Sequence, residues 1–181
     1  LWGCRSEDNT IYASKLGDPL NWNYFQSLAN DSYALEVGSD GEFTGCAAYP
    51  THLIFFKEHH MHKVFGSMPS QYQLYSTEFG IRKGSDKSAV IVNGVLYYHS
   101  LTGVMAYDGG TYPVMISEAF GDYQFKSAVG GSNGKKYYIS MLNESENKYN
   151  IFTYDILRRL WHKEDETKVV AFANVNNELI Y

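Results

Sequence analysis

The chain has 181 residues, of which 44% are hydrophobic, 16% aromatic and 19% charged. This apolar content is enough for one packed domain and excludes intrinsic disorder, and no apolar run approaches the roughly 18 residues of a membrane-spanning helix. Fifteen basic and 20 acidic side chains give a net charge of -5. That balance disfavours nucleic acid as the main partner, because phosphate binding depends on clustered Lys and Arg.

The first residues, Leu1-Trp2-Gly3-Cys4, contain no basic segment followed by an apolar one, so they do not predict a secretory signal peptide. Because both ends of the sequence resemble the interior of a domain, we expect the chain to be an excerpt of a longer protein. Cys4 and Cys46 are too few for a disulfide framework. We expect two small, partly buried thiols and folding in the cytosol.

Pairs of bulky apolar residues recur along the chain at nearly constant intervals. Their first members are 42, 40 and 43 residues apart. The pairs are Phe55-Phe56, Tyr97-Tyr98, Tyr137-Tyr138 and Ile180-Tyr181. The tetrapeptide Lys-Ser-Ala-Val precedes two of them, at 87–90 and 126–129. Two signals with one shared period indicate a structural repeat.

Within each repeat, short β-branched or aromatic runs alternate with Gly, Asn and Asp turns, which is typical of antiparallel strands. The first unit contains a long loop or insertion at 25–37. The strands expected in the two clearest units are 89–92, 95–100, 104–107 and 114–117, then 127–129, 136–141, 149–154 and 159–163. Asn93-Gly94 predicts a type I′ hairpin, and residues 130–134 (Gly-Gly-Ser-Asn-Gly) predict another turn.

Four antiparallel strands every 40–45 residues or so is the period of a β-propeller blade. We therefore predict an all-β protein, a β-propeller of four-stranded antiparallel blades in which the aromatic pairs fill the space between blades. A β-sandwich would not require this period. The expected blades span residues 1–42 (partial), 43–84, 85–123, 124–166 and 167–181 (partial).

The two partial blades do not combine into a whole one. The first piece supplies strands two to four of a blade and the last piece supplies strands one and two, so they overlap by one strand. Either the chain is an excerpt of a larger ring, or one of the predicted end strands is wrong.

His59, His60 and His62 cluster beside Glu58 between two predicted strands. A metal site is one interpretation, since His59 and His62 could converge from a loop. No Cys or Asp follows at ligand spacing, so we favour a polar hairpin tip with solvated imidazoles. A tip that responds to pH is a further alternative.

Other polar groups match ordinary turn and loop chemistry rather than a reactive site. We found no nucleophile elbow and no phosphate-binding loop. We therefore predict no catalytic residue, no cofactor and no metal ligand, and we expect the protein not to be an enzyme. The groups considered are the acidic turns at Asp40, Asp86 and Asp108, the polar loop 143–148, the acidic run 164–166, and the aromatics Trp22, Tyr24 and Phe25, which pack between blades or stack on sugars.

Several stretches resemble tailed-bacteriophage virion proteins, in particular the propeller portion of tail nozzle or tail tubular proteins of short-tailed phages and related prophage proteins. The stretches are LWGC at 1–4, NTIYASKLGDPLNW at 9–22, LIFFK at 53–57, KVFG at 63–66 and EFG at 78–80. The resemblance covers roughly residues 1–100, and its motifs are structural. It implies a component of the virion, made in the bacterial cytoplasm.

The expectation is thus a structural and interaction protein of a phage or prophage tail, a protein-binding scaffold that contacts other tail subunits and forms a homo-oligomeric ring in the particle. The alternative is a carbohydrate-binding or glycan-cleaving propeller of a host-recognition protein. A glycan-cleaving propeller would need two or more carboxylates facing one pocket.

Overall fold

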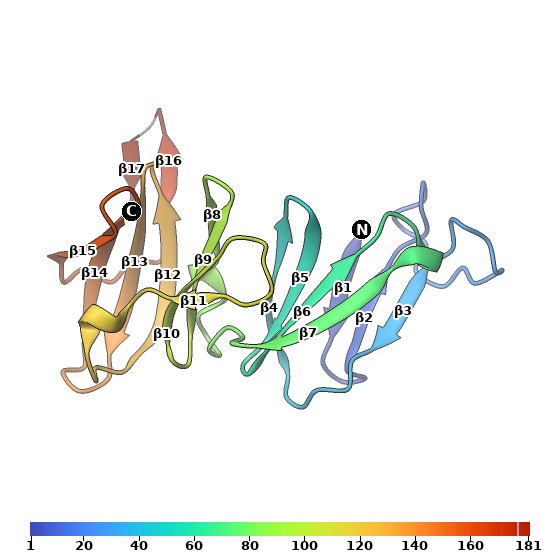
Figure 1. The fold of residues 1–181 in the computed structure, drawn as a ribbon, viewed down its shortest axis with the longest axis horizontal. Helices are drawn as coiled ribbons and strands as arrows, with labels where there is room; N and C mark the ends of the chain where they lie inside the picture. Colours follow the sequence, from blue (N-terminus) through green and yellow to red (C-terminus); the bar gives the residue numbers. More distant parts are fainter. Residues whose placement is uncertain (177) are drawn as a thin grey trace.

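The computed structural model describes residues 1–176 and 178–181. These residues form five antiparallel β-sheets, here called sheets I to V, and three short 3-10 helices, and they contain no α-helix. Sheets I to IV follow one another in chain order along the long axis of the molecule, and sheet V lies beside β12 of sheet IV (Figure 1). The predicted all-β class is confirmed.

Within every sheet the strands pair in sequence order. Sheet I contains β1 (Trp2–Arg5), β2 (Thr10–Ala13) and β3 (Tyr33–Glu36). Sheet II contains β4 (Phe43–Tyr49), β5 (His52–Lys57), β6 (His60–Phe65) and β7 (Gln73–Glu78). Sheet III contains β8 (Val90–Val92), β9 (Val95–Ser100), β10 (Gly103–Tyr107) and β11 (Val114–Met115). Sheet IV contains β12 (Phe125–Ser132), β13 (Lys136–Asn143), β14 (Lys148–Asp155) and β15 (Leu160–Asp165). Sheet V contains β16 (Ala173–Val175) and β17 (Glu178–Ile180).

The three short helices lie in connections between strands: η1 (Pro69–Gln71) lies before β7, η2 (Asp86–Ser88) before β8 and η3 (Glu118–Phe120) before β12. The eight strands expected in sheets III and IV are all present, with ends shifted by a few residues. The long loop expected at 25–37 instead spans 14–32, and β3 takes up Tyr33–Glu36. None of the helices in the described residues has the length and hydropathy of a membrane span.

The Asn93-Gly94 hairpin is confirmed by its backbone. Both residues have positive φ angles, 50° and 80°, as a type I′ turn requires. Glycine takes this conformation without steric cost, and β8 and β9 therefore pair in register up to Val92 and Val95.

The predicted turn at 130–134 is partly wrong, because Gly130 and Gly131 lie inside β12. A Cβ atom on Gly130 would lie 2.6 Å from the carbonyl oxygen of Ser88, and one on Gly131 would lie 2.3 Å from the Cβ of Phe172. These glycines let neighbouring segments approach the strand closely. The chain reverses only after Ser132.

Each pair of consecutive sheets from I to IV encloses a hydrophobic core. Each aromatic pair contributes one side chain to the core on either side of its sheet, because successive side chains of a strand point to opposite faces. Phe55 packs in the core between sheets I and II, whereas Phe56 packs between sheets II and III. In the same way Tyr98 contributes to the core of sheets II and III, and Tyr97 to that of sheets III and IV. The predicted role of the aromatic pairs as filling between sheets is thus confirmed for these residues.

Candidate functional site

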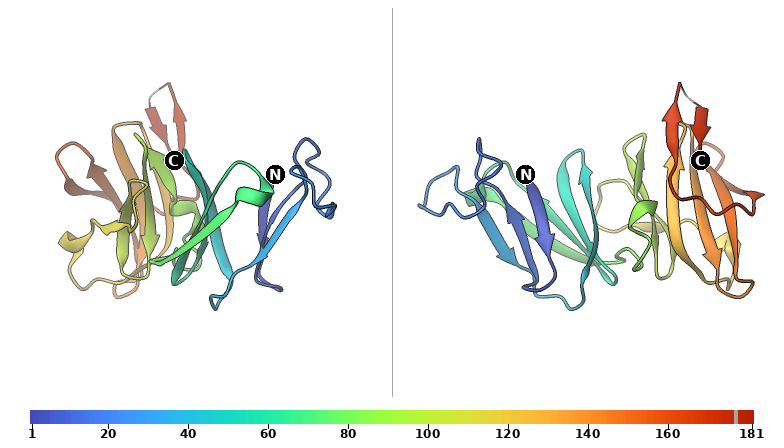
Figure 2. Two further views of the ribbon diagram at one scale, coloured as in Figure 1. Left: turned by 45° about the vertical axis from the view of Figure 1, so that its right-hand side comes forward. Right: turned by 180° about the vertical axis from the view of Figure 1, so that it is seen from behind.

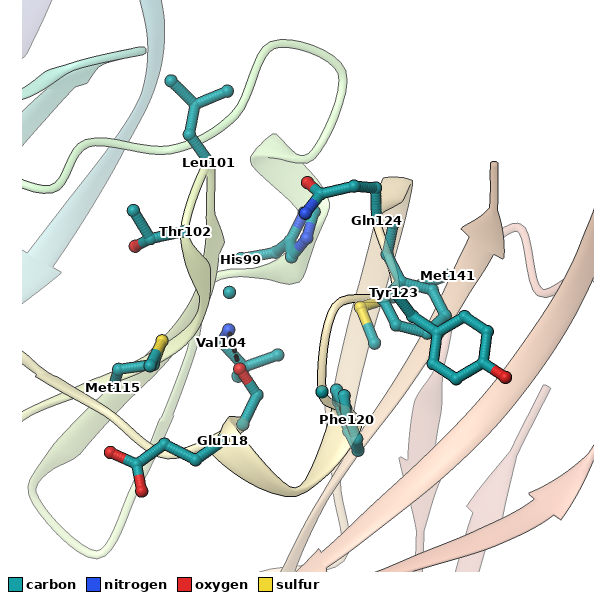
Figure 3. Close-up of a pocket in the computed structure, with 14 residues that line it drawn as sticks. His99, Leu101, Thr102, Val104, Met115, Glu118, Phe120, Tyr123, Gln124 and Met141 are labelled. Carbon is teal, nitrogen blue, oxygen red and sulfur yellow. Dashed lines mark hydrogen bonds between the residues drawn. The ribbon is translucent and has the colours of Figure 1, made fainter. Parts of the chain in front are cut away.

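A cavity of about 80 Å³ lies between sheets III and IV, under the segment that carries η3. Figure 3 shows side chains from β9, β10, β13 and the connection 116–124 converging on it. The residues that matter for its chemistry are His99, Ser117, Gln124, Met115, Phe120 and Met141. Apolar side chains thus dominate one wall, while an imidazole and an amide face the same space.

His99 is the only histidine that lines this cavity, and it is 3% exposed. Its Nδ1 lies 3.1 Å from the hydroxyl of Ser85, and that hydroxyl accepts a hydrogen bond of 3.1 Å from the backbone N–H of Ala128. The Ser85 hydroxyl therefore joins the imidazole of His99 to the backbone of β12. Burial, together with Arg82, lowers the pKa of His99 to about 4, so the ring is neutral near pH 7.

A serine hydroxyl within hydrogen-bond distance of a histidine, as in Ser85 and His99, also occurs in enzymes that use serine as a nucleophile. The surroundings of this pair do not suit that role. Ser85 is fully buried and does not line the cavity. Its oxygen is also occupied by the Ala128 N–H. The pair therefore presents no nucleophile to a molecule in the cavity, and it holds β9, β12 and the η2 connection together.

A second hollow, called here the aromatic groove, lies on the sheet IV side of the same segment and has a volume of about 280 Å³. It shares Phe120, Tyr123 and Phe125 with the cavity. Its remaining lining residues are Ala119, Asn143, Glu146, Asn150, Phe152 and Lys163. Aromatic rings, two amides and two opposite charges therefore meet in one place. Sequence reasoning missed this site, because its residues come from four separate segments of the chain.

The histidine cluster is only partly the solvated tip that we expected. His59 is exposed and His60 half-buried, but His62 is 1% exposed within β6. The two ring nitrogens of His62 lie 2.7 Å from the hydroxyls of Ser39 and Ser76. The prediction is wrong for His62 because β6 is covered on both faces, so the strand offers this side chain no route to solvent.

The metal interpretation of the cluster finds no support in the geometry. Within 1–176 and 178–181, no three His, Cys, Asp or Glu side chains are arranged to hold a metal ion. Burial, followed by Lys57 and His60, lowers the pKa of His62 to about 4. The ammonium group of Lys57, which contributes to this shift, would also repel a metal cation.

An open groove of about 270 Å³ brings Glu58, His59, His60 and Glu78 together at one end of sheet II. His60 and Glu78 are cross-strand neighbours on β6 and β7. One oxygen of Glu58 already accepts the backbone N–H of Lys83 at 3.1 Å. Strand pairing therefore brings the carboxylate of Glu78, which the sequence analysis did not consider as a site residue, into the same groove as that of Glu58.

Two lysines of sheet II are buried and bind loops of the neighbouring sheets. Lys57 donates to the side-chain oxygen of Asn9 and to the carbonyl of Ser39. Lys63 donates to the carbonyl of Thr111 at 2.7 Å. Burial lowers the pKa of both lysines. The two side chains connect sheet II to segments on either side of it.

The remaining predicted candidates lie apart from one another. Asp108 accepts the N–H of Gly110 at 3.0 Å, which is turn chemistry. Glu144, expected in a polar loop, pairs with Arg82 at 3.0 Å and with Lys126 at 3.1 Å. Trp22 and Tyr24 are half-buried and Phe25 is exposed. The other acidic side chains considered, Asp40, Asp86, Glu146 and 164–166, are exposed.

The two cysteines differ in burial. Cys4 is half-buried, as expected, and burial followed by the proximity of Cys46 raises its pKa to about 11. Cys46 is exposed, which corrects the expectation of a partly buried thiol. It lies on β4, one of the two edge strands of sheet II.

The comparisons with known proteins give no family for this chain. No protein-family model matches it, and no curated protein is similar enough to count as a relative.

Proposed function

We propose that the chain is a protein-binding scaffold built as successive blades of a β-propeller, and that it serves in the tail of a phage or prophage. The observation that carries the binding role is the loop 14–32, which joins β2 to β3. This loop projects from the end of the molecule formed by sheet I (Figures 1 and 2).

The loop exposes an unusual amount of apolar surface. Leu20 is 86% exposed, and Leu16, Phe25 and Leu28 are 43%, 53% and 52% exposed. Large apolar side chains gathered on one exposed segment typically mark an interaction surface, because they cost free energy when left in water. Loops are also the usual carriers of binding residues on a rigid β scaffold.

Internal hydrogen bonds hold this loop in one conformation. The backbone N–H of Leu16 donates to the carbonyl of Asn30 at 3.0 Å, and that of Ser32 donates to the carbonyl of Tyr24 at 2.8 Å. The carboxylate of Asp31 accepts the backbone N–H groups of Gln26 and Leu28 at 2.7 and 3.1 Å. A loop that is ordered before binding loses less conformational entropy when it binds, so the apolar side chains are preorganised for a partner.

The propeller part of the proposal is supported by the order of the sheets and by their shared construction. Sheets II, III and IV have four antiparallel strands each, in sequence order, and consecutive sheets share a core. The sheets at the two ends are smaller, with three strands in sheet I and two in sheet V. The tail assignment, and with it the virion location, is supported by the resemblance of residues 1–100 alone.

The test is co-expression of the chain with the structural proteins encoded beside its gene, followed by copurification and native mass spectrometry. The wild-type chain should retain one of these proteins, and Phe25→Asp should lose it. Leu157→Asp is the matched control, since Leu157 is 93% exposed on a turn of sheet IV far along the chain. Equal retention by wild type and Phe25→Asp, or no retention at all, would overturn the proposal.

A further inference from the structure

The aromatic groove beside sheet IV has walls suited to a flat, partly apolar ligand. The ring of Phe120 lies 4.5 Å from that of Phe152 and 5.7 Å from that of Phe125, measured between centroids. Tyr123 lies at the rim and is 55% exposed. These rings pack on one another at the base of the groove, while Tyr123 keeps much of its surface open to a ligand.

The groove also contains an unsatisfied polar group. Asn150 is 2% exposed, and its side-chain oxygen has no hydrogen-bond partner among the residues that the structure describes. Its amide nitrogen makes only a long bond of 3.4 Å to the carbonyl of Lys148. A buried acceptor without a donor costs roughly 1–3 kcal/mol, so its presence calls for an explanation. The oxygen itself is buried, so a hydroxyl or N–H group of a ligand would supply the missing donor once the Asn150 side chain turns towards the groove.

The groove is lined by one carboxylate, that of Glu146, and by one lysine whose charge is paired with another carboxylate. Glu146 is held by the turn after β13, where the side-chain oxygen of Asn143 accepts its backbone N–H at 3.3 Å. Lys163 on β15 pairs with Glu166 at 3.3 Å. A carboxylate at the mouth and a lysine that is neutralised elsewhere disfavour an anionic ligand such as a phosphate.

We propose that this groove binds a single neutral sugar residue, a hexose or an N-acetylhexosamine. The apolar C–H face of a sugar ring packs on aromatic side chains, and its hydroxyl or amide groups donate to buried acceptors. An aliphatic side chain of a peptide would pack against the aromatic rings but would leave the Asn150 oxygen without a donor. This site stands apart from the loop 14–32, so it does not depend on the proposed function.

The test is a titration of the ¹⁵N-labelled chain with glucose, galactose, mannose, N-acetylglucosamine and N-acetylgalactosamine, each at millimolar concentration. One of these sugars should shift the backbone resonances of Tyr123 and the side-chain amide of Asn150. Tyr123→Ala should weaken that binding about tenfold, which corresponds to roughly 1.4 kcal/mol. Tyr112→Ala is the control, because Tyr112 is 62% exposed but does not line the groove.

Asn150→Leu provides a second arm. It removes the unpaired oxygen, so the variant should bind no sugar while melting at or above the temperature of the wild type. If this variant fails to fold, Tyr123→Ala still decides the matter, since its side chain is largely exposed. Shifts confined to other parts of the chain, unchanged binding by Tyr123→Ala, or shifts caused by an apolar tripeptide and by none of the sugars would each overturn the proposal.

Discussion

The phenol of Tyr137 on β13 donates a hydrogen bond of 2.8 Å to the backbone carbonyl of Ser88 in η2. Tyr137 is fully buried, and its ring also stacks on Tyr97 of sheet III with centroids 5.1 Å apart. One side chain of sheet IV thus fills the shared core and satisfies a backbone oxygen of the preceding connection.

Tyr137→Phe should therefore destabilise the fold by about 1–3 kcal/mol, because it keeps the ring but leaves the buried carbonyl of Ser88 without this donor. The measurement is the free energy of unfolding in urea. Tyr112→Phe, at an exposed position, should change it by less than about 0.5 kcal/mol. Equal values for the two variants would contradict the role assigned to the Tyr137 hydroxyl.

Packing between sheets predicts energetic coupling between Phe56 and Tyr98, whose rings lie 5.0 Å apart. A double-mutant cycle with Phe56→Leu and Tyr98→Leu should give a coupling energy of about 0.5–1.5 kcal/mol. The same cycle with Phe55→Leu should give a value near zero, because Phe55 faces the core on the other side of sheet II. Comparable coupling for both phenylalanines would show that β5 does not present them to different sheets.

Stability should fall as the pH is lowered through the range set by His62. Burial, Lys57 and His60 lower its folded pKa to about 4 from the usual 6.5, so the unfolded chain takes up the proton first. The contribution of His62 to the free energy of unfolding is complete above pH 6.5 and decreases towards pH 4. The loss amounts to about 2 kcal/mol between about pH 7 and about pH 5.

His62→Gln should reduce this pH dependence, as followed by urea unfolding at the two pH values. Glutamine can still hydrogen-bond the hydroxyls that the imidazole contacts. His99 titrates in the same direction, so the informative quantity is the difference between wild type and variant. An identical slope in both would mean that His62 is protonated as readily in the folded chain as in the unfolded one.

Gly80 is expected to be intolerant of any side chain. A Cβ atom there would lie 1.7 Å from the carbonyl oxygen of Lys57 and 2.7 Å from that of His60. Since both obstacles are backbone atoms, Gly80→Ala should cost more than about 2 kcal/mol or prevent folding. Gly38→Ala is the control, because no atom lies within 4 Å of its added carbon. Thermal melting that is unchanged in Gly80→Ala would refute the close approach.

The periodic features of the fold were predictable, since spacing and alternation depend on local sequence. The aromatic pairs located the central strands, and Asn93-Gly94 defined its hairpin. The turn predicted at Gly130-Gly131 was wrong because glycine is equally suited to a turn and to close contact, and only the positions of Ser88 and Phe172 distinguish the two. The aromatic groove was not predictable from the sequence, since Asn150 lines a groove only because the segment with η3 packs over sheet IV.

Each shared core draws its side chains from two consecutive sheets. In such a linear array a substitution perturbs its immediate neighbours, and its influence fades with distance along the series. Distant sheets can then change sequence independently, so recognition surfaces at opposite ends of the molecule are able to evolve without compromising each other.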